Sequence, residues 1–195
     1  TKKNKSGIME NYKKNLELLT KNHVYSKEME HDACGVGLIA STEGKKSRAI
    51  VEYGIEALKA VWHRGAVDAD GKTGDGAGIH VEIPKDFFIE KIQVTGHDYD
   101  NSEICVGMIF LPRNDYSAQE NCKTIVESEL TKNNFSIYGW RQVPVNPKIL
   151  GEKALQTMPE ITQVLFKSND PNLLDKNLER KIYEIRKRIE NKAFN

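Results

Sequence analysis

Apolar residues recur three to four positions apart in four segments of the chain, which is the spacing of one face of an α-helix. The segments are residues 8–20, 47–62, 117–133 and 172–192. In the last of them the shared face is formed by Leu174, Leu178, Ile182, Ile185 and Ile189. We expect four amphipathic helices, and we expect the second to pack on a sheet through its apolar side.

Five other segments have the pattern of strands. Residues 35–40 and 104–111 are short apolar runs, which are typical of buried strands. Residues 79–83 alternate between apolar and polar side chains and end at a proline, which favours a half-buried strand. Residues 136–143 and 162–167 are predicted to be two further short strands. The pattern therefore indicates a mixed α and β protein.

Composition excludes several classes of protein. Lys and Arg number 29 against 28 Asp and Glu, whereas a dedicated nucleic-acid-binding protein usually carries a clear basic excess. The longest apolar stretch, residues 104–111, is far shorter than the span of about 20 residues that crosses a bilayer. The polar residues 1–5 are followed by no apolar run, so we expect no secretory leader. We therefore expect no nucleic-acid partner and no membrane partner.

The chain has three cysteines, Cys34, Cys105 and Cys122, and they form no Cys-x-x-Cys pair. An odd number at wide spacing argues against a disulfide framework and favours a reducing compartment, so we expect a cytoplasmic protein. The spacing also gives no support for a metal site. Cys105 lies in an apolar run and Cys122 in a predicted helix, so we interpret both as core residues.

Two glycine-rich segments come close to nucleotide-binding motifs without matching them. A phosphate-binding loop needs four residues between its first glycine and the Gly-Lys-Thr, but five separate Gly65 from Gly71. The carboxylates of Asp68 and Asp70 would also repel phosphate. Residues 35–40 have the glycine spacing of a dinucleotide fingerprint, but they lack the required preceding strand and following helix. We therefore interpret neither segment as a nucleotide site.

Cys34 stands between the polar leader and the first apolar run, and it has two interpretations. A free cysteine is among the most buried residue types, so it could be a core residue. It could instead be a nucleophile if the chain is cut before it, because a free α-amine with a pKa of about 7.7–8.0 can accept the thiol proton. Gly35 and Gly37 would then let a substrate approach the backbone closely.

Two motifs resemble those of glutamate synthase large subunits, whose N-terminal domain is a class II glutamine amidotransferase. They are Glu30-His31-Asp32-Ala33-Cys34-Gly35-Val36-Gly37 and Val61-Trp62-His63-Arg64-Gly65-Ala66-Val67-Asp68-Ala69-Asp70-Gly71-Lys72-Thr73-Gly74-Asp75-Gly76-Ala77-Gly78-Ile79. The resemblance implies a propeptide-like leader over residues 1–33 and the N-terminal part of the amidotransferase domain over residues 34–195. It also implies that Cys34 is the catalytic nucleophile, which hydrolyses glutamine through a thioester.

The roles of three residues in the second motif stay open. Arg64, Gly65 and Asp75 are candidates for the wall of the glutamine pocket. In the alternative interpretation, Arg64 and Asp75 join Asp68 in an ion network that only holds the loop together, which is the commoner reason for such residues. We assign no metal ligand.

The resemblance further implies an α+β fold: an incomplete four-layer αββα sandwich of the N-terminal nucleophile (Ntn) hydrolase type, with exposed sheet edges. The ammonia released from glutamine would serve the reductive amination of 2-oxoglutarate in a downstream synthase domain. That domain would use FMN and a 3Fe–4S cluster, with NAD(P)H or ferredoxin as electron donor and a small reductase subunit as a partner. We expect no cofactor on residues 1–195.

Three motifs of the family do not occur in residues 1–195. These are the Arg-Phe-Ser-Thr or Arg-Tyr-Ser-Thr segment that binds the substrate carboxylate, the Asn-Gly pair of the oxyanion hole, and a later aspartate that binds the substrate amine. Losing one oxyanion-hole donor typically costs about 100- to 1,000-fold in rate, so we expect this stretch alone to be inactive. Two rival functions remain: a different Ntn-type amidohydrolase, and a non-catalytic binding or regulatory module in which Cys34 is merely buried.

Overall fold

The computed structural model describes residues 14, 17, 18, 21, 35–61, 67–74 and 76–194. The chain divides into two compact units, Thr1–Gly65 and Ala66–Asn195, and each is described by itself below. Residues 14, 17 and 18 are helical, in agreement with the helix predicted over 8–20, and the other residues of that prediction lie outside the described ones.

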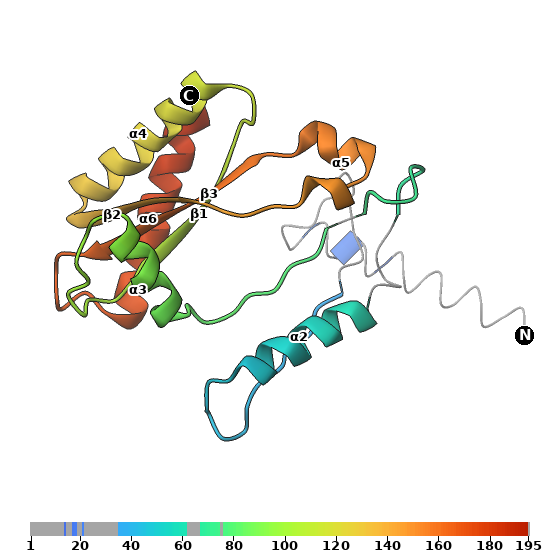
Figure 1. Ribbon diagram of the computed structural model, residues 1–195, viewed down its shortest axis with the longest axis horizontal. Coiled ribbons are helices and arrows are strands. Elements are labelled where there is room, and N and C mark those ends of the chain that lie inside the picture. The colour runs from blue at the N-terminus through green and yellow to red at the C-terminus, as the bar shows by residue number, and fades with distance from the viewer. Residues whose placement is uncertain are drawn as a thin grey trace, which may run out of the picture. The chain divides into compact units, whose positions relative to one another are not determined.

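The first unit contains helix α2, Arg48–Ala60 (Figure 1), which confirms the helix predicted over 47–62. Two ion pairs support it, and in each the two residues lie one helical turn apart. They are Arg48 with Glu52 at 3.2 Å and Lys59 with Glu56 at 2.8 Å. Lys59 also lies in the last turn, where a cation interacts favourably with the helix dipole. No residue of α2 is buried, so its predicted packing on a sheet is not seen among the described residues.

The strand predicted over residues 35–40 is wrong, because these residues have no regular secondary structure. Their apolar side chains are exposed, with Val36 at 91% and Leu38 at 89%. A strand needs a neighbour to accept and donate its backbone hydrogen bonds. The described residues of the first unit include no strand, so an apolar run alone does not form one here.

The second unit is built on an antiparallel sheet of three strands in the order β1-β3-β2. The strands are β1 Cys105–Leu111, β2 Phe135–Gln142 and β3 Glu160–Ser168, which confirms the strands predicted over 104–111, 136–143 and 162–167. The pairing of β2 with β3 is interrupted by a bulge between Ile137 and Gly139. Gly139 has a φ of 144°, and a Cβ there would lie 2.9 Å from the Thr95 methyl group, so only glycine fits.

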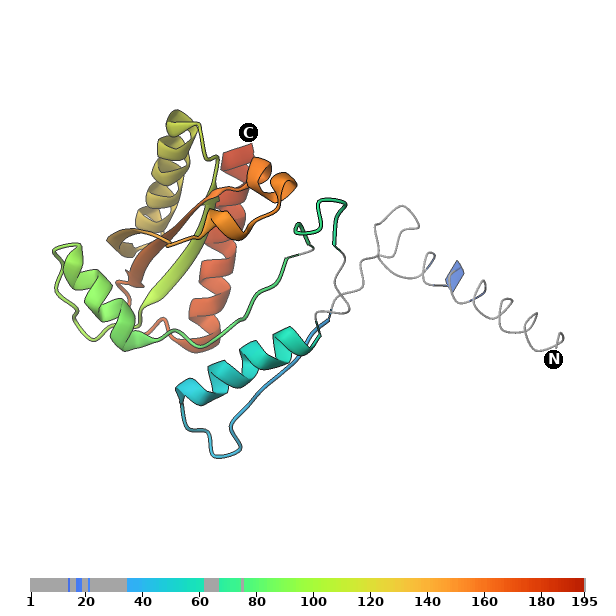
Figure 2. The same ribbon diagram turned by 45° about the vertical axis from the view of Figure 1, so that its right-hand side comes forward.

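Helices cover both faces of this sheet (Figures 1 and 2). Helices α4 Tyr116–Lys132 and α6 Asp175–Phe194 confirm the helices predicted over 117–133 and 172–192. They pack on one face, in a core formed by Val126, Leu130, Leu178 and Ile185 with Cys105, Phe135, Val164 and Phe166 of the strands.

Helix α3, Lys85–Val94, packs on the opposite face through Phe88 and Ile92. Its cluster includes Leu165, which lies between Val164 and Phe166 on β3 and therefore points to the other side of the sheet. The described part of the second unit thus has mixed helices and an antiparallel sheet, as expected for an α+β protein. The alternation along β3 explains why one strand serves two hydrophobic cores.

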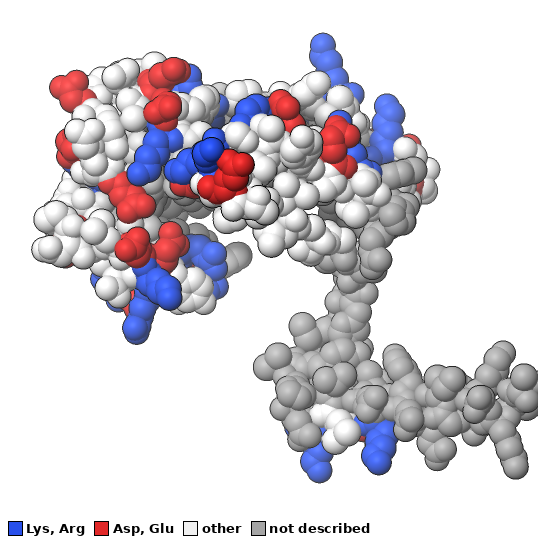
Figure 3. All heavy atoms as spheres, turned by 90° about the horizontal axis from the view of Figure 1, so that it is seen from below, with Lys and Arg blue, Asp and Glu red and all other residues white. Residues whose placement is uncertain are grey.

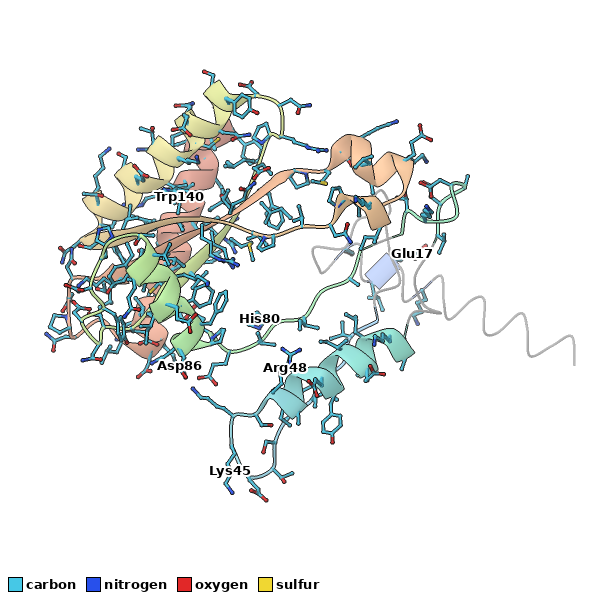
Figure 4. The ribbon with its side chains drawn as sticks, in the orientation of Figure 1. Glu17, Lys45, Arg48, His80, Asp86 and Trp140 are labelled. Carbon is cyan, nitrogen blue, oxygen red and sulfur yellow. The ribbon has the colours of Figure 1, made fainter. Side chains whose placement is uncertain are left out.

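The strand predicted over residues 79–83 is also wrong. Residues 76–84 have no regular secondary structure, and Ile79 and Val81 are 46% and 45% exposed. Figure 4 shows His80 on this stretch, which leads to α3 and its first-turn residue Asp86. The sequence alternates as a strand does, but no described strand pairs with it.

Between β2 and β3 lie two short helices that the sequence did not predict, η2 Pro147–Ile149 and α5 Glu152–Thr157.

Charged side chains of both signs are interspersed on the face seen in Figure 3. On α6, the basic residues Arg186 and Lys187 pair with Glu190 at 3.1 and 2.6 Å, as is typical of a solvated helix face. Among the helices of the described residues, none combines the length and hydrophobicity that a membrane span requires.

Candidate active site

The predicted site residues Cys34, Arg64, Gly65 and Asp75 all lie outside the described residues. The structure does describe the chain between two of them, residues 67–74, which form the central part of the second motif. We refer to residues 67–74 as the motif loop. Gly65 precedes it by two positions and Asp75 follows it directly.

Backbone hydrogen bonds close the motif loop on itself. Val67 and Gly74 form an antiparallel bridge, and inside it the Asp68 amide donates to the Thr73 carbonyl at 2.7 Å. The Gly71 amide donates to the Asp68 carbonyl at 2.9 Å, which makes a tight turn at the tip. Gly71 has a φ of 69°, a conformation that favours glycine. The two ends of the motif loop, Val67 on the side of Gly65 and Gly74 on the side of Asp75, are therefore paired with each other.

The Asp70 side chain holds the tip of the motif loop together. Its carboxylate accepts from the amides of Lys72 and Thr73 at 2.9 and 2.7 Å and from the Thr73 hydroxyl at 2.5 Å. These hydrogen bonds, led by that of the hydroxyl, hold the pKa of Asp70 well below its ordinary value. A phosphate-binding loop would offer such amides to its ligand. Here a carboxylate of the same loop occupies them, which supports the exclusion of a nucleotide site.

Two residues far along the chain fix the motif loop from outside. The Lys153 ammonium donates to the Asp68 carboxylate at 2.6 Å across 85 residues of sequence. Gly151 is buried against the loop so closely that a Cβ there would overlap the side chains of Asp70 and Thr73. The Ala154 amide, in the first turn of α5, also approaches the Thr73 hydroxyl at 3.5 Å. The motif loop is thus held against the start of α5.

The ion pair between Asp68 and Lys153 shifts the pKa of each group in the direction that favours its charged form. The hydrogen bond from Lys153 lowers the pKa of the Asp68 carboxyl, and the bond to Asp68 raises the pKa of Lys153. One of the two interpretations of the sequence places Asp68 in an ion network with Arg64 and Asp75. Its described partner is Lys153, and the network with Arg64 and Asp75 stays a prediction.

Sequence reasoning missed Gly151 and Lys153 as partners of the motif loop. Neither residue belongs to a motif, and their sequence distance from the loop leaves no periodic signal. The one local signal was a glycine just before a short helix, which is usually explained by capping alone.

Of the two described cysteines, Cys105 does not have the environment of a nucleophile. Cys105 is buried in the α4 and α6 core, and burial, with smaller effects of Glu103 and Glu179, raises the pKa of its thiol to about 12. The thiolate is the reactive form, so this thiol is inert near neutral pH. Cys105 is thus confirmed as a core residue, whereas Cys122 on α4 is only half-buried. Among the described residues, no group of three or more His, Cys, Asp or Glu side chains could hold a metal ion.

Comparison with known proteins places the chain in a family. The family of class-II glutamine amidotransferases matches residues 34–195, so the match begins at Cys34. The chain is 54% identical over 179 residues to the glutamate synthase [NADPH] large chain of Azospirillum brasilense, covering 92% of this chain and 12% of that protein. It is 38% identical over 174 residues to the ferredoxin-dependent glutamate synthase of Pyropia yezoensis, covering 89% of this chain and 11% of that protein. It is 40% identical over 162 residues to ferredoxin-dependent glutamate synthase 1 of Arabidopsis thaliana, covering 83% and 10%.

The chain therefore spans about a tenth of the length of the curated relatives that it matches. The family match covers its second unit and its glycine-rich motifs alike. On this evidence the chain belongs to the class-II glutamine amidotransferases.

Proposed function

We propose that this chain is the N-terminal glutamine amidotransferase part of a glutamate synthase large subunit. The observation that carries the proposal is the identity of 54% to a glutamate synthase large chain over 92% of this chain. We further propose that residues 1–33 are a leader removed by cleavage after Ala33 and that residues 34–195 belong to the amidotransferase domain. The family match begins at Cys34, which supports this boundary.

The proposed chemistry uses two groups of mature Cys34. The free α-amine takes the thiol proton, and the thiolate attacks the side-chain amide carbon of glutamine to form a C–S bond. The tetrahedral intermediate collapses with cleavage of the C–N bond, and the proton passes to the leaving nitrogen, which departs as ammonia. Water then attacks the thioester, the C–S bond breaks, and glutamate and the thiol are released.

We propose that Arg64, Gly65 and Asp75 belong to the glutamine site, either in the wall of its pocket or, for Arg64 and Asp75, in an ion network that holds their loop together. The planar guanidinium of Arg64 offers five donors, which suit a carboxylate or backbone carbonyls. The motif loop between them is a closed turn whose polar groups bond to one another, which suits the rim of a pocket better than a direct ligand of the substrate.

In the longer protein, ammonia would be consumed by the reductive amination of 2-oxoglutarate. That reduction needs two electrons, which we assign to NAD(P)H or ferredoxin because the relatives' names include both kinds of donor. The residues described here do not offer the ligands of an iron–sulfur cluster, since the described cysteines are Cys105 and Cys122. The FMN, the 3Fe–4S cluster and contacts with a small reductase subunit are therefore proposed for other parts of that protein.

The four-layer Ntn sandwich is likewise a proposal. Helix α3 covers only part of its face of the sheet, and Met108 and Phe110 of β1 are left 49% and 64% exposed. We propose that a second sheet packs there in the longer protein, because apolar side chains gathered on one side of a strand favour a covered face.

The test is covalent labelling of the full-length protein with a diazo-ketone analogue of glutamine. We expect the label on Cys34, blocked by glutamine and lost in Cys34→Ala, with Cys105 unlabelled as an internal control. Labelling of Cys34 that glutamine does not block would favour a different amidohydrolase. No labelling of the native protein would favour a non-catalytic module and overturn the proposal.

A further inference from the structure

We propose that a cavity between helix α4 and the neighbouring ends of strands β2 and β3 binds a small organic carboxylate with an apolar or aromatic body. We call it the α4 cavity, and the residues that would recognise the ligand are Thr162, Arg113 and Trp140. All of its lining residues belong to the second unit and are described by the structure. The inference goes beyond the proposed function and uses none of the residues of the glutamine site.

The α4 cavity has a volume of about 580 Å³, which is in the range of small-molecule sites. One wall is the first two turns of α4, where Tyr116, Gln119 and Lys123 lie three or four positions apart and so share one side of the helix. The opposite wall is the sheet, where Gln142 of β2 is paired with Thr162 of β3. Figures 1 and 2 show α4 lying along this face of the sheet.

The first argument is a buried hydroxyl without a partner. Thr162 is 8% exposed, and its Oγ1 is the one buried side-chain polar atom of the described residues that makes no hydrogen bond. Val164, two positions along β3, packs in the core under α4 and α6, so Thr162 points to the same side of the sheet, where the cavity lies. Burial of an unpartnered hydroxyl costs free energy, and a carboxylate oxygen in the cavity would accept its hydrogen bond.

The second argument is a cation whose backbone is held in place by a buried amide. Gln119 is 8% exposed, and its Nε2 donates to the carbonyls of Pro112 and Arg113 at 2.7 and 3.3 Å. These hydrogen bonds fix the segment that carries the Arg113 side chain. Arg113 has no carboxylate partner among the described residues. A guanidinium can bind a carboxylate through two parallel hydrogen bonds, so this side chain suits such a ligand.

The third argument is the aromatic lining. Trp140 and Tyr116 both line the α4 cavity. The Trp140 Nε1 donates to the Glu127 carboxylate of α4 at 2.7 Å, which fixes the ring on the α4 side of the sheet (Figure 4). Aromatic rings of this kind favour an apolar or planar ligand body over a small hydrated ion.

The charges around the cavity favour a ligand with a single negative charge. Lys123 is already paired with a glutamate one turn earlier on α4, at 2.8 Å, and the Arg141 guanidinium donates to Gln163 at 2.7 Å. Of the three cations that line the cavity, Arg113 is therefore the one left to bind a ligand. The Glu160 carboxylate also lines the cavity and would repel a doubly charged phosphate more strongly than a carboxylate.

The experiment is hydrogen exchange of the full-length protein with and without benzoate, with neutral benzamide and inorganic phosphate as comparisons. We expect benzoate alone to slow exchange in segments 112–123, 139–143 and 160–163. Arg113→Gln and Thr162→Val should each weaken benzoate binding about 10-fold. Two matched controls should bind as the wild type does. They are Arg180→Gln, at an exposed arginine of α6, and Thr157→Val, at an exposed threonine of α5.

Thermal unfolding tests the hydroxyl separately. Without benzoate, Thr162→Val should have a thermal midpoint equal to or above that of the wild type, because it removes a buried hydroxyl that lacks a partner. Benzoate should then raise the midpoint of the wild type more than that of Thr162→Val. A lower midpoint of Thr162→Val without benzoate would show that the hydroxyl is already bonded and would overturn the inference.

Two results of the exchange experiment would also overturn it. One is equal protection by benzoate in Arg113→Gln and in the wild type, and the other is protection by phosphate or benzamide in place of benzoate. None of these measurements needs glutamine turnover. A protein that does not hydrolyse glutamine would therefore refute the proposed function and leave this inference standing, and the converse also holds.

Discussion

At the scale of single residues, the same type of side chain serves very different purposes in this chain. The Asp70 carboxylate accepts three hydrogen bonds inside the motif loop, whereas Asp68 pairs with a lysine outside it. The Cys105 thiol is inert because it is buried, whereas Cys34 is proposed as a nucleophile. The local environment, and not the residue type, decides which of these groups can take part in chemistry.

Removal of the Asp70 carboxylate should loosen the motif loop. In Asp70→Ala the amides of Lys72 and Thr73 lose their acceptor, so we expect faster hydrogen exchange at both. Asp98→Ala, at an exposed aspartate outside the loop, is the control. Unchanged exchange at Thr73 would contradict the assigned role.

The hydrogen bonds that the Asp70 carboxylate accepts should depend on pH only under acidic conditions. Its pKa is lowered in the folded protein, so the stabilisation is fully present above the ordinary value of 3.8 and is lost as pH falls through the folded value. We expect resistance of the motif loop to limited proteolysis to stay constant from about pH 5 to pH 8. A steep loss of resistance between these values would show that another group controls the loop.

Cys105 should resist alkylation while the protein is folded. Its raised pKa and burial keep the thiol protonated and covered, so iodoacetamide at pH 8 should label it only after unfolding. Peptide mapping by mass spectrometry measures this directly. Native labelling of Cys105 as fast as that of a free thiol would contradict the described core.

At the scale of elements, the sequence predicted the structure well wherever an element finds its partners nearby. Strands β1, β2 and β3 and helices α4 and α6 follow their hydrophobic patterns because they form one core with one another. Residues 35–40 and 79–83 have equally good strand patterns and no described partner strand, so the pattern is not realised. The sequence did not predict helix α3, because its apolar residues do not fall on a single face. Two of them, Phe87 and Val94, are exposed in the structure.

The most buried strand of the sheet should be the most sensitive to truncation of its side chains. Leu165 of β3 is fully buried against α3, and Leu→Ala changes at such sites typically cost about 2–5 kcal/mol of unfolding free energy. Leu155→Ala on α5, where the side chain is 41% exposed, should cost less than about 0.5 kcal/mol. Denaturant unfolding compares the two. A similar loss for both would contradict the position of the core.

At the scale of the whole molecule, the candidate site was predictable only in part. Cys34, Arg64, Gly65 and Asp75 belong to contiguous motifs, which a single sequence can show. The residues that fix the motif loop, Gly151 and Lys153, meet it through tertiary folding and have no sequence signal of their own. Their role became visible only from distances and close contacts between segments far apart in the sequence.

The exposed face of β1 gives a test of the proposed four-layer fold. If a second sheet covers Phe110 in the full-length protein, Phe110→Ser should lower its unfolding free energy by about 1.5–3 kcal/mol, the value of burying such a side chain. The exposed Tyr116→Ser serves as the control for loss of an aromatic ring. Equal stability of the two variants would show that this face stays open.

The central claim is that Cys34 becomes the first residue of the mature protein and forms a bond to the glutamyl group of its substrate. Mass spectrometry of the full-length protein, quenched in acid during turnover of glutamine, tests it most directly. The account predicts a chain that begins at Cys34 and carries a glutamyl thioester on that residue. A fully active protein that retains residues 1–33, or a thioester on another cysteine, would contradict it.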